Sequence, residues 1–307
     1  MIMNNTLIFL KPYYDQKIWG GNKLKKFGYD IPSDKTGEAW LISALKDKSS
    51  IVINEEYKGM SFYDFFNNYR DTFFGSYTNE YPLLSKIIDA NDNLSVQVHP
   101  DDEYAKNKHN KLGKTECWYI LDCLKDSSII YGHKALSVEE MSEIIAKDKW
   151  EETLIKIPVK PDDFYYVPSG TVHAINKGNL IFELQQSSDI TYRLFDYHRK
   201  ESDGKERELH IEDSLNVIKF PFEIPSGESV KKRNDFLVDN NLFKLKKIIV
   251  KDHQIISPQK FWMQGTVIEG NCIINGNECT IGTSFVSKSN TALEIKGKAT
   301  LLLSWVD

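Results

Sequence analysis

The amino-acid sequence predicts a mainly β protein, because short segments rich in Val, Ile, Tyr and Phe alternate with turn residues along most of the chain. We place strands at 94–99, 116–121, 127–132, 164–170, 180–186 and 191–197. From residue 236 to the end, the pattern is almost purely strand and turn. Helical patterns are fewer, so helices are expected as insertions between strands.

Three segments predict these helices. The segment 61–75 begins with Ser61, a residue type that caps helices. The segment 137–148 opens with Ser137 and carries Glu140 three residues later, which is the spacing of a capping box. The segment 101–111 is long enough for one or two helical turns.

A chain of 307 residues is long enough for two domains. The composition changes around 220–235, where two prolines and a glycine are followed by charged residues. We therefore predict a domain at 1–225 with the functional site and the inserted helices, a linker at 226–235, and a smaller β domain at 236–307. Within the last part, the triplets EGN at 269–271 and NGN at 275–277 predict hairpin turns.

Charge and cysteine content narrow the function classes. The chain has 39 Lys and Arg against 44 Asp and Glu, a net charge of −5, which argues against general nucleic-acid binding. Its four cysteines form no CxxC pair, so free thiols in a reducing compartment are expected. The first residues do not resemble a signal peptide, and no apolar run approaches 18 residues. We expect a cytoplasmic protein that does not enter a membrane.

The segment LSVQVHPDD carries the first candidate ligands. Alternation along a strand places Ser95, Gln97 and His99 on one face and Val96 and Val98 on the other. An amide and an imidazole two residues apart can reach one metal ion. The alternative interpretation is the polar outer face of a surface strand.

The segment GKTECWYI adds a carboxylate. Its GKT triplet is not a phosphate-binding P-loop, because that motif needs a glycine at position 108, where the chain has Lys108. What remains is Lys114 and Glu116 at the start of an apolar strand, with Trp118 on the same face. A solvated strand end is the alternative interpretation.

A third segment, YYVPSGTVHAIN, brings His173 onto a strand after a Pro-x-Gly turn, and PxGxxH is a pattern of metal-binding barrels. Together, Gln97, His99, Glu116 and His173 offer two imidazoles, one carboxylate and one amide oxygen. Two histidines and a carboxylate suit zinc or non-haem iron. With a divalent ion and nearby cations, the pocket would suit an anionic or oxygen-rich small molecule.

The segment IFELQQSSDITYRLFDYHR places Glu183 and Gln185 on one face and, further on, Asp189, Thr191 and Arg193 on another. An arginine flanked by apolar residues needs an anionic partner, because burying an unpaired charge is costly. That partner is either Asp189 or an anion of the substrate.

At this point the chain resembles the type I mannose-6-phosphate isomerases (phosphomannose isomerases), in particular their short bacterial form. The resemblance is carried by QVHP with GKTE, by PSGTVHAI and by ELQQSSDITYRLFDYHR. It is supported by KIWGG at 17–21, GEAWLIS at 37–43 and YPLLSKIIDANDNLSVQVHPDD at 81–102. The motifs occur in order and cover essentially the whole chain.

The resemblance implies a cupin fold with jelly-roll β-barrels: a catalytic barrel with a few inserted helices and a smaller C-terminal barrel. It implies interconversion of mannose 6-phosphate and fructose 6-phosphate, with one zinc per chain. It maps the zinc ligands onto Gln97, His99, Glu116 and His173, and catalytic roles onto Arg193, Lys114 and Glu183. It maps substrate binding onto Ser85, Lys86 and Asp189.

Two positions depart from the general cupin pattern. Gln97 replaces the usual first histidine, which agrees with the isomerases and argues against most cupin oxygenases. Asp162 stands where cupins have a glycine, and aspartate tolerates a turn.

The reaction implied by the resemblance passes through a cis-enediol, with zinc as Lewis acid and Arg193 as the cation that stabilises the enediolate. Lys114, Glu183 and a zinc-bound water remain alternatives for the proton carrier. Cations such as Lys86, together with Ser85, would hold the phosphate.

Three other functions remain as alternatives: an iron-dependent oxidoreductase, an isomerase of another phosphorylated aldose, and a non-catalytic sugar-binding paralogue. The expected partner is a small-molecule sugar phosphate, and we expect a monomer or a weak homodimer.

Overall fold

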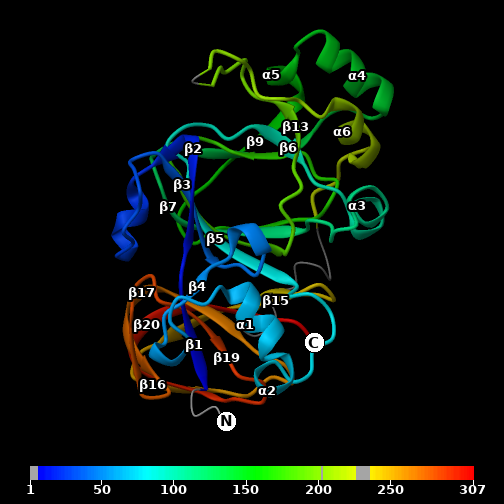
Figure 1. Ribbon diagram of the computed structural model, residues 1–307. Helices are drawn as coiled ribbons and strands as arrows, with labels where there is room; N and C mark the ends of the chain where they lie inside the picture. Colours follow the sequence, from blue (N-terminus) through cyan, green and yellow to red (C-terminus); the bar gives the residue numbers. More distant parts are fainter. Residues whose placement is uncertain (1–5, 202, 226–235) are drawn as a thin grey trace.

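The computed structural model describes residues 6–201, 203–225 and 236–307. Its strands form three antiparallel sheets, and Figure 1 shows them as two stacked β-barrels with helices at the far end of the upper one. The upper barrel contains the candidate site.

The upper barrel consists of a six-stranded and a five-stranded sheet. The six strands, in spatial order, are β10 (Phe164–Val167), β7 (Glu116–Cys123), β12 (Asn179–Gln186), β5 (Leu83–Asp89), β3 (Thr36–Ile42) and β2 (Tyr13–Gly21). The five strands are β13 (Tyr192–Phe195), β6 (Val96–Val98), β11 (His173–Ile175), β8 (Ser128–His133) and β9 (Leu154–Pro158). Between them, Ile120 and Ile181 of one sheet pack in the same buried cluster as Ile129 and Ile175 of the other. Part of the barrel interior is therefore a dry apolar core.

The lower barrel is built from a nine-stranded sheet. Its main path is β14 (Phe236–Asp239), β15 (Lys244–Val250), β20 (Leu293–Trp305), β17 (Gln264–Ile274), β19 (Ser284–Ser287), β1 (Leu7–Lys11) and β4 (Ile51–Val52). Two further strands, β16 (His253–Ile256) and β18 (Asn277–Thr280), pair with β20 and β17. The N-terminal strand β1 thus joins the C-terminal sheet, with Leu7 opposite Ser287 and Leu10 opposite Ser284.

This pairing bears on the predicted domain limits. The predicted linker at 226–235 lies outside the described residues, and a division there remains a prediction. Two N-terminal strands, β1 and β4, lie in the sheet formed by residues 236–307, which the predicted limits did not include. An alternating pattern shows that a segment is a strand but not which distant strand it pairs with.

Short helices connect the strands. They are η1 (Lys23–Phe27), η2 (Lys46–Lys48), η3 (Glu55–Tyr57), α1 (Phe62–Asn68), α2 (Arg70–Phe73), α3 (Asp102–His109), α4 (Val138–Ala146), α5 (Trp150–Thr153) and α6 (Ile211–Val217). Both predicted caps form, since the hydroxyl of Ser61 accepts from the Asp64 amide at 3.0 Å and that of Ser137 from the Glu140 amide at 3.3 Å. The predicted helix at 61–75 is two short helices, α1 and α2.

One of the two predicted hairpin turns is wrong. The NGN triplet joins β17 to β18, with Ile274 opposite Asn277. The EGN triplet lies inside β17, where the register shifts between Val267 and Glu269 and Gly270 has φ +73°. A glycine at positive φ suits a β-bulge as well as a turn, so the local sequence could not separate the two.

An aromatic cluster joins the two barrels. Phe66 of α1 lies 5.3 Å from the ring of Tyr81 and 6.2 Å from that of Trp262, which precedes β17. The Trp262 indole N–H donates to the Tyr81 hydroxyl at 3.0 Å, and that hydroxyl donates to Gln264 at 2.6 Å. Helix α1 therefore packs against both barrels.

No helix among the described residues is long and apolar enough to cross a membrane.

We expect Phe66→Ala to lower the free energy of unfolding by about 3–5 kcal/mol, because it leaves a cavity between the barrels. Phe66 is 2% exposed. Asn68→Ala, an exposed position on the same helix, is the matched control and should change stability by less than about 0.5 kcal/mol. Urea unfolding measures both, and equal losses for the two variants would contradict this role of the cluster.

Candidate metal centre and active site

Gln97, His99, Glu116 and His173 meet at the inner face of the upper barrel. Gln97 on β6 and His173 on β11 are directly opposite in the five-stranded sheet, and Glu116 begins β7 of the facing sheet. The Pro-x-Gly turn before β11 forms as predicted, with Gly170 at φ +82°.

The three strongest ligands lie close together. The candidate ligand atoms of His99, Glu116 and His173 all lie within 4.8 Å of one another. One Glu116 oxygen is 3.5 Å from His99 Nε2, and the other is 3.4 Å from His173 Nε2. The amide of Gln97 is 3.3 Å from His173 Nε2. The side chains of His99, Glu116 and His173 are at most 1% exposed, so their polar atoms need a partner inside the protein.

Both histidines are in the neutral protonation state that a metal ligand requires. Burial lowers the pKa of His173 to about 4 and that of His99 well below its ordinary value. Both rings are therefore neutral near pH 7. The His173 Nδ1–H donates to the Thr171 carbonyl at 2.9 Å, which leaves the lone pair of Nε2 directed toward Glu116.

Glu116 is the group that a cation would compensate. One of its buried oxygens lies 3.2 Å from the Lys114 ammonium, and the other has no hydrogen-bond partner among the described residues. Burial, and then the nearby Glu183 carboxylate, raise the pKa of Glu116 to about 7 in the metal-free site. Two neutral imidazoles, one carboxylate and an amide oxygen are a donor set for a divalent cation, and a buried carboxylate between two neutral imidazoles fits one bound here.

Lysines and glutamates continue the polar region away from this centre. Lys114 Nζ is 3.0 Å from His99 Nε2 and 3.2 Å from Glu116. Lys86 Nζ lies between two carboxylates, 3.2 Å from Glu183 and 3.4 Å from Glu38. Burial alone would raise the pKa of Glu183 and of Glu38. The Lys86 ammonium is the main opposing influence, and it holds the pKa of Glu183 below its ordinary value and that of Glu38 at about 2.

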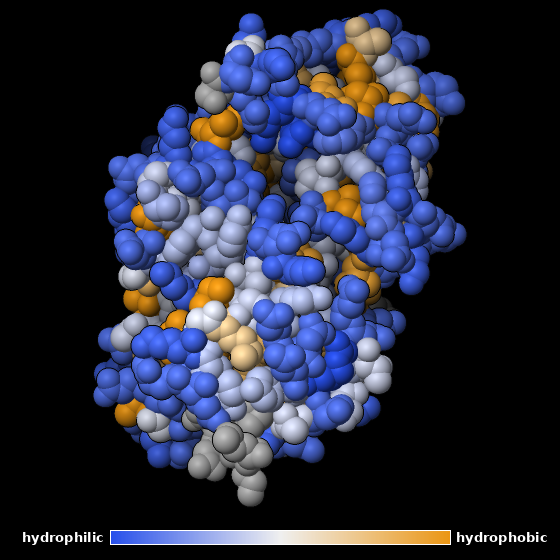
Figure 2. All heavy atoms as spheres, in the orientation of Figure 1, coloured by the Kyte–Doolittle hydropathy of each residue, from blue (hydrophilic) through white to orange (hydrophobic). Residues whose placement is uncertain are grey.

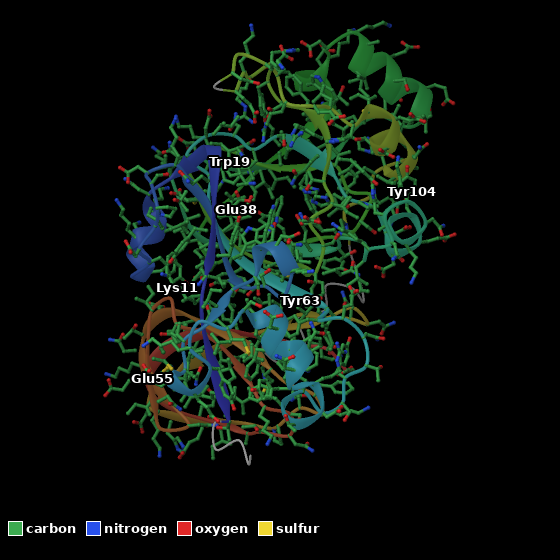
Figure 3. The ribbon with its side chains drawn as sticks, in the orientation of Figure 1. Lys11, Trp19, Glu38, Glu55, Tyr63 and Tyr104 are labelled. Carbon is green, nitrogen blue, oxygen red and sulfur yellow. The ribbon has the colours of Figure 1, made fainter. Side chains whose placement is uncertain are left out.

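A cavity of ≈ 280 Å³ opens beside the centre. Figure 2 shows the upper half of the molecule hollowed, with a mainly hydrophilic rim, and Figure 3 labels Trp19 and Glu38 on strands β2 and β3 of that half. Six cationic side chains line the cavity against three carboxylates: Lys17, Lys48, Lys86, Lys114, Arg193 and Arg207 against Glu38, Glu183 and Asp189. This excess of positive charge suits an anionic ligand.

The structure brings nine of the ten predicted site residues to this region. Lys86, Gln97, Lys114, Glu183, Asp189 and Arg193 line the cavity, while His99, Glu116 and His173 are buried beside it. Ser85 does not line it. Ser85 shares a face of β5 with Leu83 and Ile87, which pack in the core between the barrels, whereas its neighbour Lys86 faces the cavity. Strand alternation does not allow both to contact one ligand.

Of the two partners considered for Arg193, Asp189 does not pair with it. Asp189 accepts from Lys111 Nζ at 2.8 Å, and the guanidinium of Arg193 donates to the Glu208 carbonyl at 2.6 Å. Among the described residues, no carboxylate lies within 4.0 Å of the Arg193 guanidinium, and its buried Nε has no partner. Arg193 thus faces the cavity without a direct ion pair, and the carboxylates of Asp196 and Glu201 act on its charge from beyond 4.0 Å.

Sequence reasoning missed several lining residues. Glu38 and Trp40 alternate on β3 within the GEAWLIS motif, and Trp19 belongs to the KIWGG motif. Both motifs supported the resemblance. A charged residue within an otherwise apolar strand, as Glu38 is, indicates a functional position. Lys48 and Arg207 lie on connections, where no periodicity indicates which way a side chain points.

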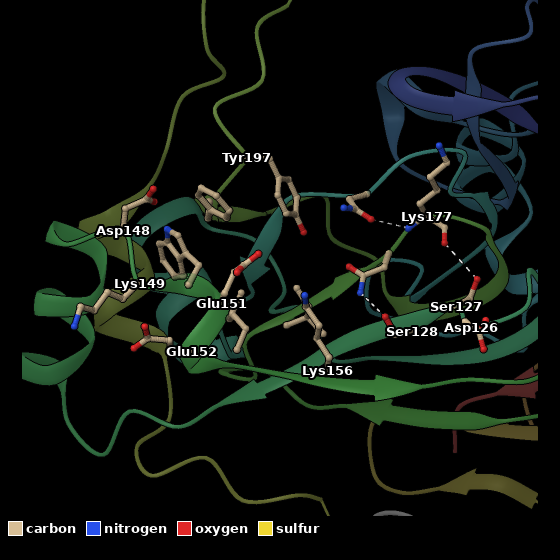
Figure 4. Close-up of a pocket in the computed structure, with 16 residues that line it drawn as sticks. Asp126, Ser127, Ser128, Asp148, Lys149, Glu151, Glu152, Lys156, Lys177 and Tyr197 are labelled. Carbon is tan, nitrogen blue, oxygen red and sulfur yellow. Dashed lines mark hydrogen bonds between the residues drawn. The ribbon is translucent and has the colours of Figure 1, made fainter.

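A larger cavity of ≈ 680 Å³ lies elsewhere on the upper barrel (Figure 4). It is lined by residues of β8, β9 and α5 and by Tyr197. None of the ten predicted residues lines it, and its three lysines face four carboxylates. The described residues around it offer no buried metal-ligand set, so the smaller cavity is the candidate active site.

Comparison with known proteins identifies the family. Residues 7–129 match the family model described as phosphomannose isomerase type I, catalytic domain. The mannose-6-phosphate isomerase ManA of Bacillus subtilis is 45% identical over 275 residues, 87% of this chain and 87% of the relative. The chain belongs to the type I phosphomannose isomerases. As a member of this family it is an enzyme, an aldose–ketose isomerase.

Further relatives agree with this assignment. The mannose-6-phosphate isomerase of Streptococcus mutans is 53% identical over 212 residues, 69% of this chain and 67% of the relative. The crystal structure of mannose 6-phosphate isomerase from Bacillus subtilis superposes with a TM-score of 0.91 at 39% identity, covering 98% of this chain and 100% of that one. The predicted mainly β cupin fold is confirmed.

We expect His99→Ala and His173→Ala each to abolish stoichiometric binding of a divalent cation, because each removes a ligand from a closely packed set. His109→Ala is the matched control, since His109 lies on α3 and contacts Tyr192 outside the centre. Metal content after dialysis against Zn²⁺ measures the outcome. Full occupancy in both ligand variants would remove these residues from the metal centre.

Cation affinity should rise with pH up to about pH 7 and level off above it. The cation competes with the proton on Glu116, whose pKa is about 7 in the metal-free site, whereas the low pKa values of both histidines leave them proton-free over this range. Below pH 7 the affinity should fall up to about tenfold per pH unit, with release of one proton on binding. Calorimetry in buffers of different ionisation enthalpy counts that proton, and release of two protons at pH 6 would assign a histidine to the titration instead.

Proposed function

We propose that this isomerase interconverts mannose 6-phosphate and fructose 6-phosphate through a cis-enediol, using one Zn²⁺ per chain. The observation that carries the proposal is the buried set of His99, Glu116 and His173 beside a cavity with an excess of cations. The names of the relatives support the substrate pair.

Gln97, His99, Glu116 and His173 would hold the zinc. Gln97 offers an amide oxygen, because the two ends of a glutamine amide exchange places by a simple rotation. Bound zinc supplies a Lewis acid that orients the open-chain sugar and offsets negative charge on its oxygens. The family assignment favours this chemistry over the iron oxidoreductase that the ligand types alone would also allow.

We assign proton transfer at carbon to Glu183. The reaction needs a base that takes the proton from C2 of the aldose and returns it to C1, while protons exchange between O1 and O2. Glu183 lines the cavity as a carboxylate held ionised by Lys86, and the indole N–H of Trp118 donates to it at 3.0 Å. Lys114, which faces both the cavity and the metal ligands, would hold the proton at the sugar oxygen.

Arg193 is assigned to the negative charge of the enediolate. It lies on β13 directly opposite Gln97, so its side chain begins next to the proposed zinc ligands. Its backbone is held by β13–β6 pairing, and its Nη1 by the Glu208 carbonyl. A fixed cation without a carboxylate partner can stabilise developing negative charge without first breaking an ion pair.

The phosphate needs a cation other than Lys86. Lys86 lies between Glu38 and Glu183, with its ammonium 4.6 Å from the centre of the Trp40 ring. Its charge is already compensated twice. We therefore keep Lys86 and Asp189 as residues that shape the sugar site and do not assign the phosphate to them.

The direct test is an assay of purified protein with mannose 6-phosphate, with fructose 6-phosphate formation coupled to a nicotinamide readout. We expect turnover that is lost on chelation and restored by Zn²⁺. Turnover that survives complete removal of metal would contradict the zinc proposal. A folded, zinc-loaded protein without turnover would contradict the substrate assignment.

Arg193→Ala should lower kcat by about 10²–10³, because it removes the fixed cation next to the reacting oxygens. Zinc content should stay at the wild-type level, since Arg193 is not a ligand. Steady-state kinetics with parallel metal analysis tests both statements, and a wild-type kcat would remove Arg193 from the mechanism.

A further inference from the structure

Arg207 lines the cavity and has no role in the function proposed so far. Its Nε and Nη2 donate to the two oxygens of Asp196 at 2.7 and 2.5 Å. This two-point contact fixes the guanidinium plane, because both groups are planar forks. Arg207 is therefore a cation held in one orientation at the cavity wall.

A short hairpin places Arg207 there. Lys200 pairs with Glu206 in an antiparallel bridge, and the Glu201 amide donates to the Lys205 carbonyl at 2.8 Å. In this register, the next pair of residues away from the turn is Arg199 and Arg207, which therefore lie opposite each other. Like charges facing each other across strands are destabilising, and the buried Asp196 carboxylate offsets them by bonding both guanidinium groups.

The two arginines differ in direction. Arg199 donates to the Asn93 carbonyl and to Asp196, its charge also lies 3.9 Å from Asp92, and it does not line the cavity. Arg207 lines the cavity, and so does Arg193. Burial, and then the Arg207 guanidinium, lower the pKa of Arg193, against the opposing effect of the Asp196 and Glu201 carboxylates.

The charge of this cluster is not balanced within the protein. Arg199 and Arg207 both pair with one buried carboxylate, Asp196, and Arg193 has no carboxylate within 4.0 Å among the described residues. Among the described residues, the only other carboxylate within 4.0 Å of a guanidinium of these three is the half-exposed Asp92, beside Arg199. The uncompensated charge therefore lies on the side of Arg193 and Arg207, facing the cavity. A group with two negative charges and several acceptor oxygens, such as a phosphate monoester, matches it.

We propose that Arg207 binds the phosphate of the substrate, with Arg193 beside it, and thereby determines the preference for phosphorylated over unphosphorylated sugars. This rests on the proposed function. Arg193 lies opposite Gln97 of the metal centre, so it stands between the reacting carbons and the phosphate held by Arg207. The sugar would enter with its carbonyl end toward the metal ligands and its phosphate toward Asp196 and the hairpin.

The test compares Arg207→Gln with Arg207→Lys and with Arg199→Gln. Arg199→Gln is the matched control, because it removes the other guanidinium from the same carboxylate but not from the cavity wall. We expect Arg207→Gln to raise KM for mannose 6-phosphate about 10- to 100-fold with kcat changed less than about threefold, the loss expected for charge-assisted hydrogen bonds. Arg207→Lys should fall between wild type and Arg207→Gln, and Arg199→Gln should stay within about threefold of wild-type KM.

Inorganic phosphate gives a second readout that does not need turnover. It should inhibit the wild-type enzyme competitively and raise its Tm, and both effects should weaken at least tenfold in Arg207→Gln. Circular dichroism checks that the variants are folded. We expect Arg207→Gln to fold, because the buried Asp196 carboxylate keeps Arg199 as its ion-pair partner. An unchanged KM and unchanged phosphate inhibition in Arg207→Gln would overturn the inference, as would an equal effect of Arg199→Gln.

The two proposals fail in different ways. A wild-type protein that does not turn over mannose 6-phosphate would contradict the proposed function. If its Tm still rises with phosphate and that rise is lost in Arg207→Gln, the phosphate site stands. If the wild type is active and Arg207→Gln behaves like it, only the role of Arg207 is wrong.

Discussion

The buried ion pairs of the upper barrel are the constraint on which the rest of the site depends. Lys86 lies between Glu38 and Glu183, and Lys114 contacts Glu116, all at most 9% exposed. Removing charges from water costs several kcal/mol per ion unless partners are placed closely. The two sheets must therefore hold these groups in register, and the cavity keeps a fixed electrostatic pattern before any ligand arrives.

That pattern divides the site into three regions with different chemistry. At one end, the buried Glu116 carboxylate lies within 3.5 Å of the neutral imidazoles of His99 and His173, so a divalent cation is stabilising there. In the middle, Glu183 is kept ionised by Lys86 although burial opposes this, so it is present in the form that can accept a proton. Toward the hairpin, Arg193 and Arg207 leave positive charge uncompensated. A sugar phosphate has the complementary order of groups, with oxygens at one end and a dianion at the other.

The lower barrel contributes support rather than ligands. The residues that line the cavity all come from the part of the chain before residue 208. The lower barrel packs on the outer face of the six-stranded sheet through the core that contains Phe66, Tyr81 and Trp262. This covers the face of β5 that carries Ser85 and leaves the opposite face, with Lys86, for the cavity.

The sequence by itself determined the features that depend on near neighbours. Alternation placed Gln97 and His99 on the face that meets His173, and Asp162 takes the positive φ expected of its turn, +74°. Pairing between distant strands was decided only by the tertiary structure: β1 joins β19, and the lower barrel covers the face of β5 that carries Ser85. So was the direction of long side chains on connections, such as Arg207. The alternation of side chains along a strand is a local property of the backbone. Which strands pair, and which charges neutralise one another, depends on groups that meet only after folding.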